Sequence, residues 1–186
     1  GVMYQRGEGG PANPKAALEY TKKSAEAGYP TGQLNLFFHY WHGETVERDR
    51  AEALSWLQKA ADQNHPKALF ALAELIQENG VPEKTLADAE ELLARCMNSA
   101  NAEQSLCHKA MFQYARLMAL RSDQLQFLNT AALNLQRCYE AESAEGELAQ
   151  ACAQLSKSVI GKIRKLVAKK QGSADEIATA EMIANF

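Results

Sequence analysis

The chain has 186 residues, of which 46% are hydrophobic and 23% charged, and its formal net charge is −3 at pH 7. Abundant alanine, beside 11 Gly and 5 Pro, favours helices over sheets. No apolar run approaches the ~18 residues that a membrane-spanning helix needs. The small negative charge also excludes attraction to nucleic acid by the overall field of the molecule.

The first half of the sequence repeats itself at a shift of 36 residues, and such a fixed period is the signature of a repeat protein. A third, weaker copy matches through Ala89, Leu92 and Cys96. The aligned pairs of the first two units are Tyr4 and Tyr40, Gly7 and Gly43, Ala17 and Ala53, Tyr20 and Trp56, Ala25 and Ala61, Gly28 and Asn64, Pro30 and Pro66, and Gly32 and Ala68.

The repeated positions predict where helices begin and end. Asn13, Asp49 and Thr85 are residue types whose side chains cap a helix N-terminus. Gly28 and Asn64 are the residue types that best tolerate the left-handed backbone at a helix C-terminus, and a proline follows each of them. Each unit is therefore predicted to consist of a helix, a loop, a second helix and a tight turn.

Small residues recur on the second helices and allow close approach of helix backbones, while larger residues fill the space beside them. A hairpin of this kind cannot bury both of its faces alone, so the units are expected to stack on one another. The small set is Ala17, Ala53, Ala89, Ser24, Ala60 and Cys96, and the larger set is Tyr20, Trp56 and Leu92.

This pattern resembles the Sel-1-like repeat family, a relative of the tetratricopeptide repeats, over about residues 1–100. The sequence departs from the family pattern at Phe37, where the family has glycine, and the third unit lacks the central tyrosine and the aromatic residue of the second helix. In the second unit the matching residues are Gly32, Leu36, Tyr40, Gly43, Ala53, Trp56, Lys59, Ala60, Ala61 and Asn64.

The resemblance implies an all-α fold, a right-handed α–α superhelical solenoid of Sel-1-like, tetratricopeptide-like hairpins with a helical C-terminal cap. We expect repeats at about 1–28, 29–64 and 65–100, followed by degenerate helical hairpins and capping helices over 101–186. Because Gly1 falls in the middle of a first helix by register, we also expect further sequence upstream in the natural protein.

Beyond residue 100 the period fades, but apolar residues still recur at helical spacing. Three long stretches, 106–120, 125–139 and 148–166, each predict an amphipathic helix. Ser173 is a candidate cap for a short final helix. The terminal units of a repeat protein need a polar outer face, so we interpret this half as degenerate repeats that end in a cap.

The four cysteines form two pairs, each symmetric about a predicted turn: Cys96 with Cys107, and Cys138 with Cys152. Equidistant positions of an antiparallel hairpin face each other, so each pair is a disulfide candidate that would imply an oxidising compartment such as the bacterial periplasm. The alternative is four small core thiols. Zinc binding is not favoured, because no two cysteines are clustered as C-x-x-C.

The segment 34–43 is the richest in candidate contact residues. Leu36, Phe37 and Tyr40 take packing positions of the repeat. In this architecture the first helix of each unit tends to line the concave face, where exposed aromatic residues would anchor a partner. The alternative is that the aromatic side chains pack against the neighbouring hairpin. The predicted partner-binding residues are Asn35, Phe38, His39, Trp41 and His42, with Glu74 and Glu78 from the next unit.

Two histidines of this segment, His39 and His42, are three residues apart, which is compatible with metal binding, but no third ligand follows and no metal site is predicted. Cys107 and His108 point in different directions on a helix and make no nucleophile–base pair. No glycine-rich phosphate loop, nucleophile motif or HExxH motif occurs. We therefore predict no catalytic residues, no cofactor and no enzymatic activity.

The stretch 155–170 is basic and contains no acidic residue. Such a helix could contact an anionic membrane, nucleic acid or an acidic partner, or it could be a solvated face whose apolar stripe packs inward. The basic residues are Lys157, Lys162, Arg164, Lys165, Lys169 and Lys170.

These observations predict a non-enzymatic scaffold of the bacterial envelope that binds a protein or peptide on its concave face. A carbohydrate or cell-wall ligand binder, with Trp41 and Phe38 as stacking platforms, is the alternative, and a cell-wall hydrolase is a third interpretation. We expect no nucleic-acid partner and no transmembrane segment. A periplasmic or secreted location is expected if the disulfides form, and a cytoplasmic location otherwise.

Overall fold

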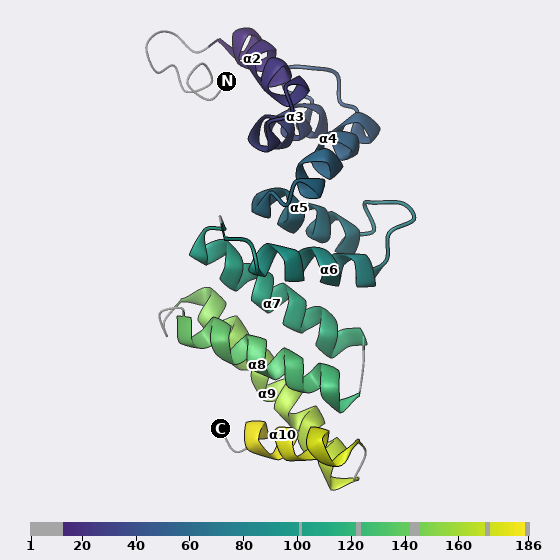
Figure 1. Ribbon diagram of the computed structural model, residues 1–186, viewed down its shortest axis with the longest axis vertical. Helices are drawn as coiled ribbons and strands as arrows, with labels where there is room; N and C mark the ends of the chain where they lie inside the picture. Colours follow the sequence, from purple (N-terminus) through teal and green to yellow (C-terminus); the bar gives the residue numbers. More distant parts are fainter. Residues whose placement is uncertain (1–12, 101, 122–123, 142–145, 170–171, 185–186) are drawn as a thin grey trace. The chain divides into compact units, whose positions relative to one another are not determined.

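The computed structural model describes residues 13–100, 102–121, 124–141, 146–169 and 172–184, and in these ranges it contains nine helices and no strand. Among the described helices, none is long and apolar enough to cross a membrane. The helices are α2 (Pro14–Glu26), α3 (Pro30–His42), α4 (Arg50–Asp62), α5 (Pro66–Gln77), α6 (Leu86–Met97), α7 (Gln104–Arg121), α8 (Leu125–Ala141), α9 (Glu147–Ala168) and α10 (Ala174–Ala184) (Figure 1).

The helices fall into two compact units, and the division between them lies within the third predicted repeat. Unit 1 comprises residues 1–85 and 99–101, and unit 2 comprises residues 86–98 and 102–186. Within unit 1, helices α2 to α5 pack successively, each against the next along the chain. Consecutive helices joined by short connections thus form adjacent antiparallel hairpins, as the repeat pattern predicts.

The predicted helix caps Asn13 and Asp49 are confirmed, whereas the cap predicted at Thr85 stays a prediction. The Asn13 side chain accepts a hydrogen bond from Ala16 N at 3.0 Å, and the Asp49 side chain accepts one from Glu52 N at 3.0 Å. Gly28 and Asn64 have the left-handed backbone, with φ of 87° and 58°. The prolines after these two turns occupy the first turns of α3 and α5, where a missing N–H costs no helical hydrogen bond.

Gly32 lies at a close approach of α3 to α2. A Cβ built on Gly32 would lie 2.7 Å from Ser24 Cβ and 2.8 Å from Ala25 N, both in the facing helix. The same register in the next repeat holds Ala68 and Ala60, both fully buried. The small residues of the repeat therefore set how closely its helices approach.

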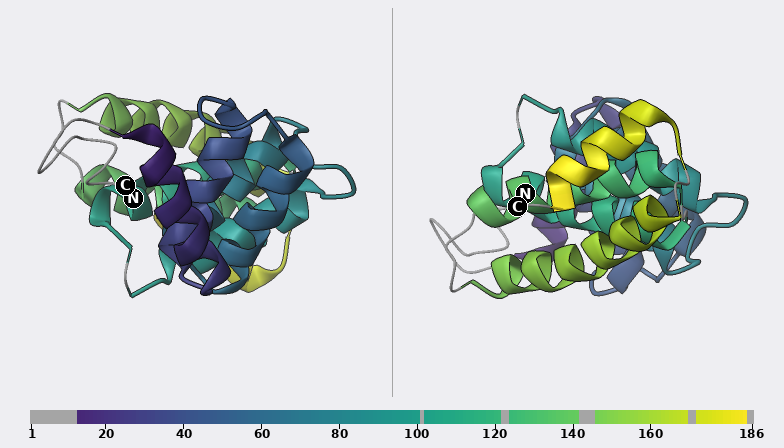
Figure 2. Two further views of the ribbon diagram at one scale, coloured as in Figure 1. Left: turned by 90° about the horizontal axis from the view of Figure 1, so that it is seen from above. Right: turned by 90° about the horizontal axis from the view of Figure 1, so that it is seen from below.

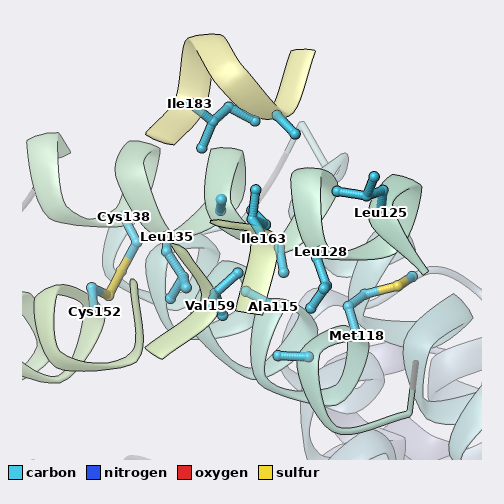
Figure 3. Packing of buried hydrophobic residues seen from close by; sticks show 14 residues of the cluster. Ala115, Met118, Leu125, Leu128, Leu135, Cys138, Cys152, Val159, Ile163 and Ile183 are labelled. Atoms are coloured by element: carbon cyan, nitrogen blue, oxygen red, sulfur yellow. A yellow bond between two sulfur atoms is a disulfide. The ribbon is translucent and has the colours of Figure 1, made fainter. Parts of the chain in front are cut away.

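Unit 2 has its core among α7, α8, α9 and α10, which pack on one another. Figure 3 shows Ile183 reaching from α10 toward the layer that contains Leu135 and Ile163. α10 turns back from the end of α9 and packs on both α8 and α9 (Figure 2, right). Ser173 caps it as predicted, because its Oγ accepts from Glu176 N at 3.3 Å while Glu176 Oε2 accepts from Ser173 N at 2.8 Å.

The two cysteine pairs differ. Cys138 and Cys152 form a disulfide between α8 and α9, with their Cα atoms 6.5 Å apart (Figure 3). Cys96 and Cys107 are not disulfide-bonded. Burial, with a smaller contribution from the nearby Cys107 thiol, raises the pKa of Cys96 to about 12. Cys96 therefore stays protonated and has little thiolate character at neutral pH. The symmetry of the sequence makes both pairs disulfide candidates, and the structure contains one disulfide, Cys138–Cys152.

Some residues assigned to packing by the sequence pattern are instead exposed. Tyr20 is 48% exposed, although its counterpart Leu92 in the third unit is 7% exposed. In unit 2, Leu120 and Tyr139 end the apolar stretches 106–120 and 125–139, yet they are 73% and 43% exposed. Each stands near the end of its helix.

Two helical glycines allow a matched test of this packing. We expect Gly32→Ala to destabilise the fold by roughly 1–3 kcal/mol, because the added methyl group overlaps Ser24 and the α2 backbone. Gly161→Ala in α9 is expected to stabilise it by up to about 1 kcal/mol, because a Cβ there meets nothing within 4 Å and alanine restricts the unfolded chain. Urea unfolding followed by circular dichroism measures both, and effects of the same sign would contradict this account.

Candidate functional site

The candidate site is built on α3, the first helix of the second repeat. The helix ends at Gly43, whose φ of 74° is left-handed and whose N–H donates to His39 O at 3.0 Å. A Cβ at Gly43 would lie 2.9 Å from Arg48 Cβ, so glycine is required both for the backbone and for the space. The following loop returns to the helix, where Asp49 N donates to Tyr40 O at 3.0 Å.

Three aromatic rings gather along one side of α3. The Phe37 ring is buried, and its centroid lies 4.9 Å from that of Phe38 and 5.5 Å from that of Trp41. These separations and tilted geometries are favourable for aromatic pairs. Phe37 stands where the repeat family has glycine, and its buried ring contacts both neighbouring rings. Trp41 itself is half-buried.

The exposed edge of the site is a stacked pair of rings. Phe38 is 44% exposed, and its ring stacks on that of the exposed His42 with centroids 6.0 Å apart and planes 7° from parallel. Asn35 is half-buried one turn before Phe38 on the same helix. An exposed aromatic side chain held rigid by stacking loses little conformational entropy when a partner covers it.

His39 is buried, so the prediction that its side chain is exposed for partner binding is wrong. Its side chain is 8% exposed, and its Nδ1 lies 2.8 Å from Thr45 Oγ1 in the loop after α3. Burial lowers the pKa of His39, an effect that the Glu44 carboxylate opposes. The ring is therefore a neutral packing residue that ties the loop to the helix. The two histidines thus have different roles.

The two glutamates predicted for this surface lie on α5 and at its end. Glu74 and Glu78 are both exposed, and Glu78 N donates to Glu74 O at 3.0 Å at the C-terminus of the helix. The ring contacts described above join residues of α3 and do not include these glutamates. Their part in binding stays a prediction.

Sequence reasoning missed one member of the site, Arg50. Its guanidinium carbon lies 5.3 Å from the centroid of the Trp41 ring, a cation–π contact between the first residue of α4 and the last turn of α3. The contact depends on the loop of residues 43–49 folding back, and no repeat position marks it. The site thus combines aromatic rings, an imidazole and one cation.

Among the described residues, no group of three or more histidine, cysteine, aspartate or glutamate side chains is placed to hold a metal ion. The contacts present at α3 are ring stacking, a cation–π contact and hydrogen bonds.

Comparison with known proteins identifies the repeat. Residues 1–29 and 30–65 match the family model described as Sel1 repeat. The chain is similar to the crystal structure of a Sel1 repeat protein from Oxalobacter formigenes, with a TM-score of 0.67 and 22% sequence identity, over 99% of this chain and 69% of that chain.

It is also similar to c5321, a protective antigen of uropathogenic Escherichia coli strains that displays an SLR fold. That TM-score is 0.56, with 17% identity over 98% of this chain and 44% of that chain. No curated protein matches the sequence. At these identities the two structures establish the fold alone. Two segments of the chain therefore match the Sel1 repeat, and the chain has the all-α helical solenoid fold seen in these Sel1 repeat structures.

Proposed function

We propose that the chain is a non-enzymatic scaffold that binds a protein partner through α3, with Phe38, Trp41 and His42 as the anchoring side chains. Sel1 repeats typically mediate protein–protein interactions, which supports this class of function. The observation that carries the proposal is the exposed Phe38–His42 stack on a rigid helix. Aromatic residues held in this way are the usual centres of binding energy in protein interfaces.

The environment of Trp41 favours a protein partner over a carbohydrate. A sugar ring stacks on an open aromatic face, whereas the Trp41 ring has Arg50 over it and Phe37 beside it. The Arg50 guanidinium would have to leave before a sugar could occupy that face. A protein surface can instead contact the edge of Trp41, the exposed Phe38 ring and the arginine together, as mixed aromatic and arginine patches do.

We further propose that the protein works in an oxidising compartment, such as a bacterial periplasm or the cell exterior. The Cys138–Cys152 disulfide supports this location, because structural disulfides persist where thiols are not kept reduced. A partner from the same compartment is then expected.

The binding proposal predicts loss of a partner when either aromatic anchor is truncated. The immobilised chain would capture proteins from an extract of its source organism, and quantitative mass spectrometry would compare wild type with Phe38→Ala and Trp41→Ala. For a partner identified in this way, we expect each substitution to raise the dissociation constant by about tenfold or more, equivalent to about 1.4 kcal/mol of lost binding free energy.

The matched control is Tyr29→Ala, because Tyr29 is 65% exposed at the opposite end of α3. We expect its binding to stay within about twofold of wild type. Circular dichroism would establish that each variant remains folded. If Phe38→Ala and Trp41→Ala leave every interaction intact, the α3 surface is not the binding site. Quenching of tryptophan fluorescence by soluble cell-wall sugars would instead favour the carbohydrate alternative.

A further inference from the structure

α9 has two faces: an apolar face packed in the core of unit 2 and a basic outer face. Val159 and Ile163 are buried in the core of unit 2, and Leu155 and Leu166 pack against that core. Because the apolar side chains of α9 are packed inside unit 2, the helix has no exposed apolar stripe that could insert into a membrane.

Three lysines are exposed along this face, Lys157 and Lys165 on α9 and Lys169 at its C-cap. They span 12 helical steps, or about 18 Å along the helix axis. The helix carries one acidic residue, Glu147, in its first turn, far from this stretch. Lys162 has another role, because its Nζ donates to Ala119 O at 3.0 Å near the end of α7.

Acidic groups on the neighbouring helices are partly occupied by contacts of their own. Glu140 Oε1 on α8 accepts from Gln136 Nε2 at 2.8 Å. Glu176 Oε2 on α10 accepts from the Ser173 backbone at 2.8 Å. These carboxylates are therefore held in local hydrogen bonds within α8 and at the start of α10. They keep their negative charge, and the face of α9 is basic because residues 155–169 include no acidic side chain.

An apolar groove lies beside this basic face, between α8, α9 and α10. It encloses about 370 Å³. Leu135, Ile160 and Ile183 contribute buried or half-buried apolar surface to its lining. Tyr139, Glu140 and Lys157 are exposed residues that also line it. Lys157 thus belongs both to the groove and to the basic face, which makes the two surfaces continuous.

We propose that this surface is a second docking site, which binds an acidic amphipathic peptide segment of a protein partner. An apolar side chain of the segment enters the groove, and acidic side chains lie along the lysines of α9. Charge complementarity selects the acidic partner. The basic face extends well beyond the groove, so a polymeric segment fits it better than a small molecule does. The apolar lining of the groove favours a segment with apolar side chains over the charged backbone of nucleic acid.

Fluorescence anisotropy with the full chain tests the proposal. The probe is a fluorescein-labelled helical peptide with leucine on one face and glutamate on the other, and its comparison is the same peptide with glutamine in place of glutamate. We expect the glutamate peptide to bind about tenfold or more tightly than the glutamine peptide at low salt, and added salt to reduce that difference. Lys157→Ala is expected to weaken glutamate-peptide binding by about fivefold, and Ala153→Phe, which fills the groove, to weaken both peptides.

The matched control is Lys15→Ala, which removes the same charge from an exposed position on α2. We expect its affinity to stay within about twofold of wild type. Equal binding of the two peptides, or equal losses in Lys157→Ala and Lys15→Ala, would overturn the proposal. Tighter binding to phosphatidylglycerol vesicles or to a single-stranded oligonucleotide than to the glutamate peptide would also overturn it. Lys157 is exposed, so its substitution tests binding without disturbing the fold.

Discussion

Loss of the Cys138–Cys152 disulfide is expected to lower the free energy of unfolding by about 3 kcal/mol. The bond closes a loop with a sequence separation of 14 residues between α8 and α9. A cross-link of this length removes conformations from the unfolded chain, which raises the free energy of the unfolded state. The two helices that it joins carry much of the core of unit 2.

Guanidinium unfolding of the oxidised and reduced protein measures this effect. Trp41 and Trp56 both lie in unit 1, so tryptophan fluorescence follows that unit, whereas far-UV circular dichroism follows the helices of both. Reduction should therefore shift the dichroism midpoint more than the fluorescence midpoint. The double variant Cys138→Ala/Cys152→Ala should reproduce the reduced protein under non-reducing conditions.

Counting thiols provides an independent check of the same bond. The denatured, non-reduced protein should expose two reactive thiols, those of Cys96 and Cys107, and reduction should raise the count to four. In the folded protein Cys96 should react slowly, because burial holds its pKa near 12. Four thiols before reduction would show that the disulfide is absent, and none would show that the second pair is bonded as well.

The local structure of unit 1 could be predicted from the sequence because short-range chemistry determines it. Asn13 and Asp49 accept hydrogen bonds from backbone groups three residues away, and Gly28 and Asn64 need only a left-handed backbone. Such features repeat with the sequence and require no knowledge of distant neighbours. Tyr20 shows the limit, since a repeat position predicts its helix and its register but not how much of its ring a neighbour covers.

The candidate site could be predicted only in part, for a related physical reason. Phe38 and His42 are exposed as the repeat register predicts, because that register separates packing positions from the rest. His39 differs because its burial depends on the loop that brings Thr45 to within 2.8 Å of its ring. Arg50 reaches Trp41 through the same loop. Contacts made by an irregular segment leave no periodic signal in the sequence.

The fully buried Leu128 on α8 provides the second large stability prediction. Its side chain is 0% exposed within the core cluster of unit 2. We expect Leu128→Ala to lower the free energy of unfolding by about 3 kcal/mol or more, because it removes buried methyl groups and leaves a cavity that rigid helices cannot fill. Figure 3 shows Leu128 among the side chains of α7 and α9 that would line this cavity.

Leu133 on the same helix is the matched control, because it is 41% exposed. Leu133→Ala makes the same chemical change with the same effect on helix propensity, so the difference between the variants isolates burial. We expect Leu133→Ala to cost less than about 1 kcal/mol. Guanidinium unfolding followed by far-UV circular dichroism measures both values. Equal losses would mean that α8 presents a different face to the core, which would also move Tyr139 and Glu140 away from the groove beside Lys157.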